Sequence, residues 1–108
     1  QAASFSEQVQ KLVMEQLASG SLKGDAVAEK LSMSRRTLLR RLEQEGTTYK
    51  ALLETARRRV AEHHLTRTEL TIHELAFLLG YSETAAFSRA FKRWTKTSPA
   101  EFRERARR

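Results

Sequence analysis

One short pattern of residues occurs twice in this chain of 108 residues and limits its fold more than any other feature. In each copy an alanine precedes a leucine by three positions, and a turn and a second apolar segment follow. The alanines Ala28 and Ala76 lie 48 positions apart, whereas the later apolar residues Leu38 and Phe87 lie 49 apart. The second copy therefore has one extra residue in its turn. Each copy predicts two helices joined by a tight turn, the helix-turn-helix motif.

The residue types at these positions fit the geometry of that motif. Two helices that cross closely need a small side chain where their backbones approach, and Ala28 and Ala76 provide one. The turn needs a residue that tolerates positive φ, which Gly80 does at no steric cost. Ser32 takes that place in the first copy and departs from the pattern. Four apolar residues are expected to be buried on the inner faces of the second helices: Leu38, Leu42, Phe87 and Phe91.

Helix signals continue along the whole chain, and no useful stretch alternates with period two. Capping boxes are predicted at Ser4, before the first helix, and at Ser98, before the last. The fold class is therefore all-α, with two helix-turn-helix subdomains at residues 1–46 and 66–108, joined by a long linker helix at 47–65. The seven predicted helices lie between Ser4 and Gly20, at 25–31, 34–45, 48–65, 72–79 and 83–95, and from Ser98 onward.

Charge is distributed unevenly along the chain. The net charge is +7, of which residues 1–33 carry −1 and residues 34–108 carry +8. The basic excess begins with the second helix of the first motif, which favours a polyanionic partner. There is no cysteine, and no apolar run approaches the ~18 residues that cross a bilayer. We therefore expect a cytoplasmic protein without disulfides.

The inner faces of the two helices determine which residues point outward, where a helix can enter the major groove of DNA. In the first copy these include arginines, whose forked guanidinium matches guanine O6 and N7. In the second copy they are mostly short side chains, for which we expect fit, phosphate contact and DNA shape to matter more. A linker helix of about 25 Å is long enough to hold two such helices near successive major grooves. The outward positions are Arg35, Arg36, Leu39, Arg40 and Glu43, then Thr84, Ala85, Ser88, Arg89 and Lys92.

Three segments resemble the DNA-binding domain of AraC/XylS-type bacterial transcription regulators: residues 31–42, the sequence IHELAFLLGY at 72–81, and residues 87–103. The resemblance covers the chain from about residue 24 and implies a sequence-specific activator or repressor that binds promoter DNA and often contacts RNA polymerase. It also implies an N-terminal effector or dimerisation domain, so we expect this chain to be part of a longer regulator. Leu39 and Lys96 depart from the family, which commonly has a polar residue and glycine there.

Phosphate contacts are expected from Ser34, Arg35, Thr37 and Lys92. The resemblance implies base-contacting roles for further residues. The positions that match base-contacting ones in the family are Arg36, Leu39 and Arg40 in the first motif, and Thr84, Ala85, Ser88 and Arg89 in the second.

The histidines, the consecutive arginines and the aromatic residues have other interpretations. The adjacent His63 and His64 point about 100° apart on a helix, so no metal site is expected, and no motif indicates a cofactor or catalysis. Of the three consecutive arginines at 57–59, at least one is expected to be structural. The alternative function is a basic helical module that binds a protein partner or RNA. The aromatic residues expected to be core are Phe5, Phe77, Tyr81, Phe87, Phe91, Trp94 and Phe102.

Overall fold

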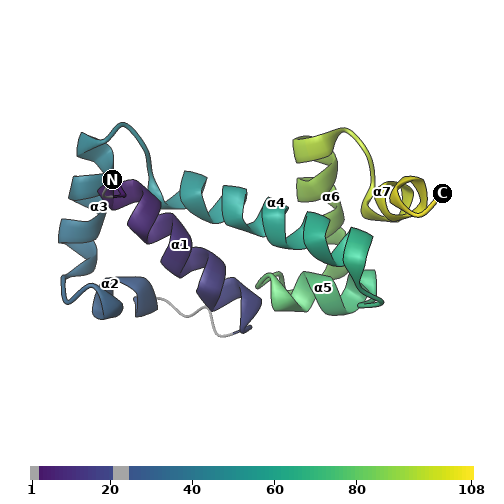
Figure 1. Ribbon diagram of the computed structural model, residues 1–108, viewed down its shortest axis with the longest axis horizontal. Coiled ribbons are helices and arrows are strands. Elements are labelled where there is room, and N and C mark those ends of the chain that lie inside the picture. The colour runs from purple at the N-terminus through teal and green to yellow at the C-terminus, as the bar shows by residue number, and fades with distance from the viewer. Residues whose placement is uncertain (1–2, 21–24) are drawn as a thin grey trace. The chain divides into compact units, whose positions relative to one another are not determined.

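Seven α-helices and no strand make up the part of the chain that the structure, a computed structural model, describes, which is residues 3–20 and 25–108 (Figure 1). The predicted all-α class is therefore confirmed, and the observed helix ends lie within a few residues of the predicted ones. The helices are α1 (Phe5–Ala18), α2 (Ala26–Lys30), α3 (Arg35–Gln44), α4 (Tyr49–Arg67), α5 (Ile72–Leu78), α6 (Thr84–Thr95) and α7 (Pro99–Ala106).

Polar side chains begin most of these helices, because the first backbone N–H groups of a helix have no partner within it. Capping boxes form at Ser4, Thr71 and Ser98, each with a glutamate three residues later. Ser34 and Thr48 accept hydrogen bonds from backbone N–H groups at the starts of α3 and α4. The predicted caps are thus confirmed. In the boxes at Thr71 and Ser98 the hydrogen bonds to the glutamate carboxylates hold the pKa of those carboxyls below its ordinary value.

The chain divides into two units between Ala56 and Arg57, inside α4. The helix itself is continuous from Tyr49 to Arg67. The division of the sequence into two subdomains and a separate linker at residues 47–65 remains a prediction.

The first unit contains α1, α2, α3 and the first half of α4. Its core is formed by apolar residues spaced three and four apart, namely Val9, Val13 and Leu17 of α1, Val27 and Ala28 of α2, and Leu38 and Leu42 of α3. Two contacts fasten α1 to the C-terminal half of α3. The guanidinium of Arg41 lies 3.9 Å from the ring centroid of Phe5, and the backbone N–H of Ser6 donates to Glu45 over 3.1 Å. This hydrogen bond is the main reason that the pKa of Glu45 is lowered.

The second unit contains the rest of α4 with α5, α6 and α7. Aromatic rings form much of its core: the centroid of Phe91 lies 5.8 Å from that of Phe87 and 5.2 Å from that of Phe102. The prediction for Phe77 was wrong, since 57% of this residue is exposed. Helix α5 buries the face that carries Leu75 and Ala76, and Phe77 points away from it.

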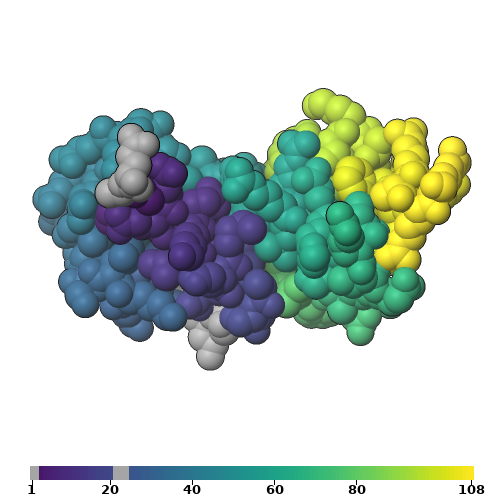
Figure 2. Space-filling model, in the orientation of Figure 1, coloured from purple at the N-terminus to yellow at the C-terminus, as the bar shows by residue number. Residues whose placement is uncertain are grey.

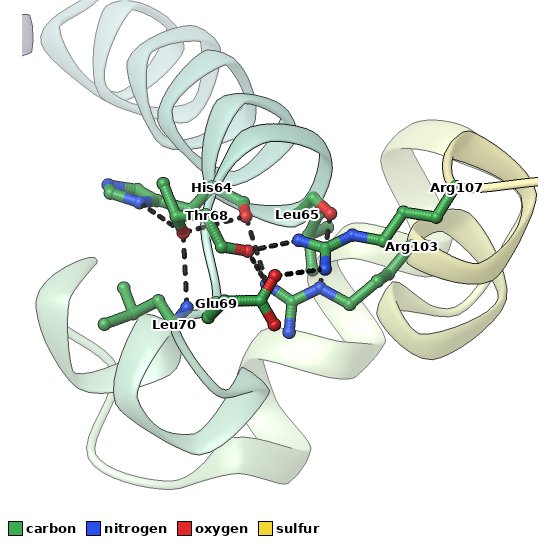
Figure 3. A network of polar contacts seen from close by, with 7 residues as sticks. All are labelled: His64, Leu65, Thr68, Glu69, Leu70, Arg103 and Arg107. Carbon is green, nitrogen blue, oxygen red and sulfur yellow. Dashed lines mark hydrogen bonds and ion pairs between the residues drawn. The ribbon is translucent and has the colours of Figure 1, made fainter.

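Arg103 of α7 and Arg107, which follows it, donate hydrogen bonds to backbone carbonyl groups at and just after the C-terminal end of α4 (Figure 3). The Nη2 group of Arg103 donates to the carbonyl of His64 over 3.0 Å, and its Nε donates to the carbonyl of Leu65 over 3.2 Å. Arg107 donates to the carbonyl of Thr68 and to Glu69. Burial, with smaller contributions from the charges of His63 and Arg103, lowers the pKa of His64. These contacts fix α7 against α4 within the second unit.

No helix among the described residues is both long and apolar enough to span a membrane.

Candidate nucleic-acid interface

The first motif consists of α2, a turn and α3, and its buried residues determine which side of α3 faces solvent. Leu38 and Leu42 are buried, and Ala28 of α2 is buried where the two helices meet. Leu79 is buried in the second motif, whereas its counterpart Leu31 in the first motif is only half-buried. The pattern of burial confirms the predicted inner face of α3.

Three predicted base-contacting residues therefore share the outer face of α3. Arg36, Leu39 and Arg40 follow one another at steps of three and one, which places them on one side of the helix, and all three are exposed. Leu39 is one of two large hydrophobic residues that are exposed in the part of the chain that the structure describes, at 39%. The side chains of α3 are part of the surface of the first unit (blue in Figure 2). The outer face of α3 thus carries two exposed arginines and an exposed leucine.

The predicted phosphate contacts near the start of α3 already have partners within the protein. Ser34 Oγ accepts from the backbone N–H of Thr37 over 3.1 Å and donates to the Thr37 hydroxyl over 3.0 Å. Arg35 lies 3.7 Å from the carboxylate of Asp25, with both side chains largely exposed. Such an exposed ion pair contributes little energy, so Arg35 is free to exchange this partner for a phosphate. Arg41, in the same helix, instead contacts Phe5 of α1.

The second motif consists of α5, a turn and α6. Phe87, Ala90 and Phe91 are buried on the inner face of α6. Lys92, predicted to contact phosphate, is exposed one turn after Ser88. The predicted base-contacting residues lie on the outer face of the helix, where Ala85 and Arg89 are exposed and Thr84 and Ser88 are half-buried. Unlike α3, this face carries mostly short side chains.

The turns of the two motifs have the same backbone hydrogen bonds. The N–H of Met33 donates to the carbonyl of Ala28 over 3.1 Å, and the N–H of Tyr81 donates to that of Ala76 over 3.0 Å. Ser32 and Gly80 occupy matching positions with φ of 54° and 92°. The predicted need for positive φ in both turns is confirmed. In the first motif a serine adopts this conformation, which costs an L-residue roughly 1–2 kcal/mol.

Lys96 shows the same conformation at the end of α6. Its φ is 69°, and its N–H donates to the carbonyl of Lys92 over 2.8 Å. The helix thus ends here in the left-handed conformation that glycine usually provides.

Arg57 holds the second turn in place. The sequence predicted only that at least one of the arginines at 57–59 is structural. The Nε of Arg57 donates to the carbonyl of Leu79 over 2.9 Å, and its guanidinium lies 4.8 Å from the ring centroid of Tyr81. The next arginine, Arg58, donates to the carbonyl of Trp94 over 3.3 Å and forms an ion pair with Glu62. The prediction that at least one of the three arginines is structural is confirmed.

Sequence reasoning missed His73, a residue of α5 that contacts the recognition face. Its Nδ1 is hydrogen-bonded to the hydroxyl of Thr84, the first residue of α6, over 2.9 Å. The two residues lie 11 positions apart in different helices, and no periodicity in the sequence relates them. The sequence could have suggested the contact in one way only, because it predicts both residues near the ends of two helices that cross.

Comparisons with known proteins agree with this architecture. A family model described as a helix-turn-helix domain matches residues 27–105. The ornithine utilization regulator of Pseudomonas aeruginosa is 41% identical over 80 residues, which are 74% of this chain and 24% of that protein. The regulator VirS of Mycobacterium tuberculosis is 39% identical over 101 residues, 94% of this chain and 30% of VirS. This chain therefore spans about a quarter to a third of the length of these relatives.

A solved structure is similar over nearly the whole chain. The C-terminal domain of AraT, a response regulator from Geobacillus stearothermophilus, has a TM-score of 0.75 and 32% identity, and the match covers 94% of this chain and 85% of that one.

Proposed function

The chain belongs to the AraC/XylS family of bacterial helix-turn-helix transcription regulators, and we propose that α3 and α6 are its two recognition helices, each entering a major groove of promoter DNA. The observation that carries this proposal is the matched pair of motifs. In each, the second helix buries one apolar face and leaves the opposite face exposed. An α-helix with one free face fits the major groove, which is about 12 Å wide.

Helix α3 supplies most of the direct base recognition. The guanidinium groups of Arg36 and Arg40 can each donate two hydrogen bonds to guanine O6 and N7. Leu39 lies on the same face and has no hydrogen-bonding group, so its contribution is an apolar contact with the methyl group of thymine. Arg35 and the start of the helix contact the backbone phosphates, which fix the register of the helix in the groove.

Helix α6 contributes through fit more than through hydrogen bonds. Ala85 offers only a methyl group, and Ser88 and Thr84 offer single hydroxyls that can donate or accept. Arg89 and Lys92 add positive charge for bases and phosphates. Small side chains allow the helix to approach the groove closely, so we expect this half of the site to depend on DNA shape as well.

The continuity of α4 supports engagement of both helices on one duplex. Its 19 residues correspond to about 28 Å of helix, comparable with the roughly 34 Å between successive major grooves on one face of DNA. We propose that adjacent major grooves are bound together and that the DNA bends where the spacing does not match.

The relatives are about three times as long as this chain, so the activity of the whole regulator is part of the proposal. We propose that the domain acts in the cytoplasm with an N-terminal effector or dimerisation domain, and that it contacts RNA polymerase at promoters. The family and these relatives are transcription regulators, and no feature of the two outer faces favours the alternative of a protein-binding or RNA-binding module.

A salt-dependent mobility shift tests the proposed function. Duplexes enriched from a random pool by this chain are expected to form a complex that survives excess non-specific DNA. The affinity should fall steeply with salt because phosphate contacts release counterions. Equal binding to the enriched duplex, to unrelated duplexes and to heparin would contradict sequence-specific recognition. Preferential binding to RNA of the same sequence would favour the alternative.

A further inference from the structure

His73 connects the two helices of the second motif at the point where α6 begins. Its Nδ1 atom and the hydroxyl of Thr84 are hydrogen-bonded over 2.9 Å. The other side of the imidazole is packed edge-on against Phe77, with centroids 4.9 Å apart and planes at 84°. His73 and Phe77 are both exposed, and Phe77 is 57% so. The exposed imidazole of His73 thus lies between the ring of Phe77, in its own helix, and the side chain of Thr84, the first residue of α6.

This contact limits what the Thr84 hydroxyl can offer to DNA. A free threonine hydroxyl rotates and can donate or accept, so it distinguishes bases poorly. A hydroxyl that donates to Nδ1 has only its lone pairs left for a base, whereas one that accepts from Nδ1 keeps its own proton. In both cases the hydrogen bond selects one rotamer of Thr84, and a hydroxyl that donates to Nδ1 is in addition left as an acceptor only.

We propose that His73 is a positioning residue for DNA recognition, which acts through Thr84 and makes that hydroxyl a selective contact. The inference rests on the proposed function, because it assumes that the outer face of α6 enters a groove. It assigns to the first helix of the motif a part in specificity, although that helix carries none of the predicted base-contacting residues. His73 itself need not touch DNA for this role.

The geometry distinguishes this role from a structural one. The buried face of α5 is formed by Leu75 and Ala76, and the cap of the helix is formed by Thr71 and Glu74. His73 belongs to neither set. Removing its side chain therefore leaves the core and the cap of α5 in place, and the thermal stability of the domain should change little.

A double-mutant cycle tests the proposal. The variants are His73→Ala, Thr84→Val and the two combined, and each is assayed for relative affinity at all four base pairs of the position contacted by the first turn of α6. His73→Ala should reduce discrimination at that pair by about fivefold, the contribution of one hydrogen bond. In the Thr84→Val background, where no hydroxyl remains, the same replacement should have no further effect.

His73→Asn is the matched control, because an asparagine amide places a polar atom the same number of bonds from Cα as Nδ1. It should restore part of the discrimination, and it keeps the test open if the alanine variant folds poorly. Three results would overturn the proposal: unchanged discrimination in His73→Ala, an equal loss in the presence and absence of the Thr84 hydroxyl, or uniform weakening at every base pair, which would indicate a direct phosphate contact. If the unmodified domain showed no base preference at any position, the proposed function itself would fail.

Discussion

The two helix-turn-helix motifs have the same backbone conformation in their turns and differ in most of the side chains that face outward. Both turns place one residue at positive φ and form the same hydrogen bond back to a buried alanine. Yet α3 presents Arg36 and Arg40, whereas α6 presents Ala85 and Ser88. The buried positions and the turn thus define the motif, and its outer face is free to diverge because it contributes little to folding. This freedom explains how one scaffold, used twice, gives two halves with different chemistry.

The motifs are also supported differently. Helix α3 is held by α1, the helix at the N-terminus of the chain, which contacts Arg41 and Glu45. Helix α6 is held from the C-terminal side, where Phe91 packs on Phe102 of α7, and its turn is fastened by Arg57. Each recognition helix therefore has an additional helix that fixes its orientation. The first motif depends on α1 and the second on α7.

Removing one arginine side chain from each recognition helix should show the difference between the two motifs most clearly. We expect Arg40→Ala to reduce discrimination at one base pair by about 1–3 kcal/mol, because a bidentate contact with guanine is lost. Arg89→Ala should change base preference less and weaken binding more evenly. Arg59→Ala, which removes the same charge from an exposed position of α4, controls for general electrostatics. Equal changes in preference from Arg40 and Arg89 would show that the two halves recognise bases alike.

The turns allow a comparison of stability. An alanine at Gly80 would have to adopt φ near 92°, at a cost of roughly 1–2 kcal/mol, and its Cβ would lie 3.3 Å from Nη2 of Arg57. Ser32→Gly should have the opposite effect and stabilise the first unit by up to about 1 kcal/mol, since the strain of a positive φ is relieved. Thermal unfolding of both variants measures these changes. A loss of stability in Ser32→Gly would mean that the left-handed turn is not strained.

Leu39 provides a smaller and more local test. If its side chain contacts a thymine methyl, replacing that thymine by uracil should weaken binding by about 0.8 kcal/mol, the value of one buried methyl-sized group. The same replacement should have no effect on a Leu39→Ala variant. Competition binding with singly substituted duplexes gives the answer. A thymine-to-uracil effect that is equal in both proteins would assign the methyl contact to another residue.

The smallest expected effect is a loss of stability in mild acid. It is expected only in the second unit, which contains all three histidines. The pKa of His64 is lowered in the folded protein, so the unfolded chain binds the proton more readily. The stability that neutral His64 contributes is therefore present above its ordinary pKa of about 6.5 and is lost as the pH falls. Hydrogen exchange should show faster opening of α6 than of α3 below that pH. His64→Gln should remove the difference, and an unchanged difference in that variant would exclude His64 as its cause.

Sequence alone predicted the helices and the outer faces because both depend on local signals. Capping residues such as Ser34 and Thr71 and the spacing of Leu38 and Leu42 act within one or two turns of a helix. The roles of Arg57, His73 and Arg103 were not predictable in detail. Each of these side chains contacts backbone or side-chain atoms 11 or more positions away, and a long polar side chain at an exposed position gives no sign of its partner. Phe77 was misjudged because it was assigned to the buried face of its helix, which Leu75 and Ala76 form instead.

The most direct test of the account is the sequence pattern of duplexes that the domain selects from a random pool. We predict two half-sites about one helical turn apart, with strong base preferences in the half contacted by α3 and weaker ones in the half contacted by α6. Arg40→Ala should then erase a preference in the first half only. A single short motif, or stronger preferences in the half that responds to changes in α6, would contradict the central claim that the two motifs divide recognition unequally.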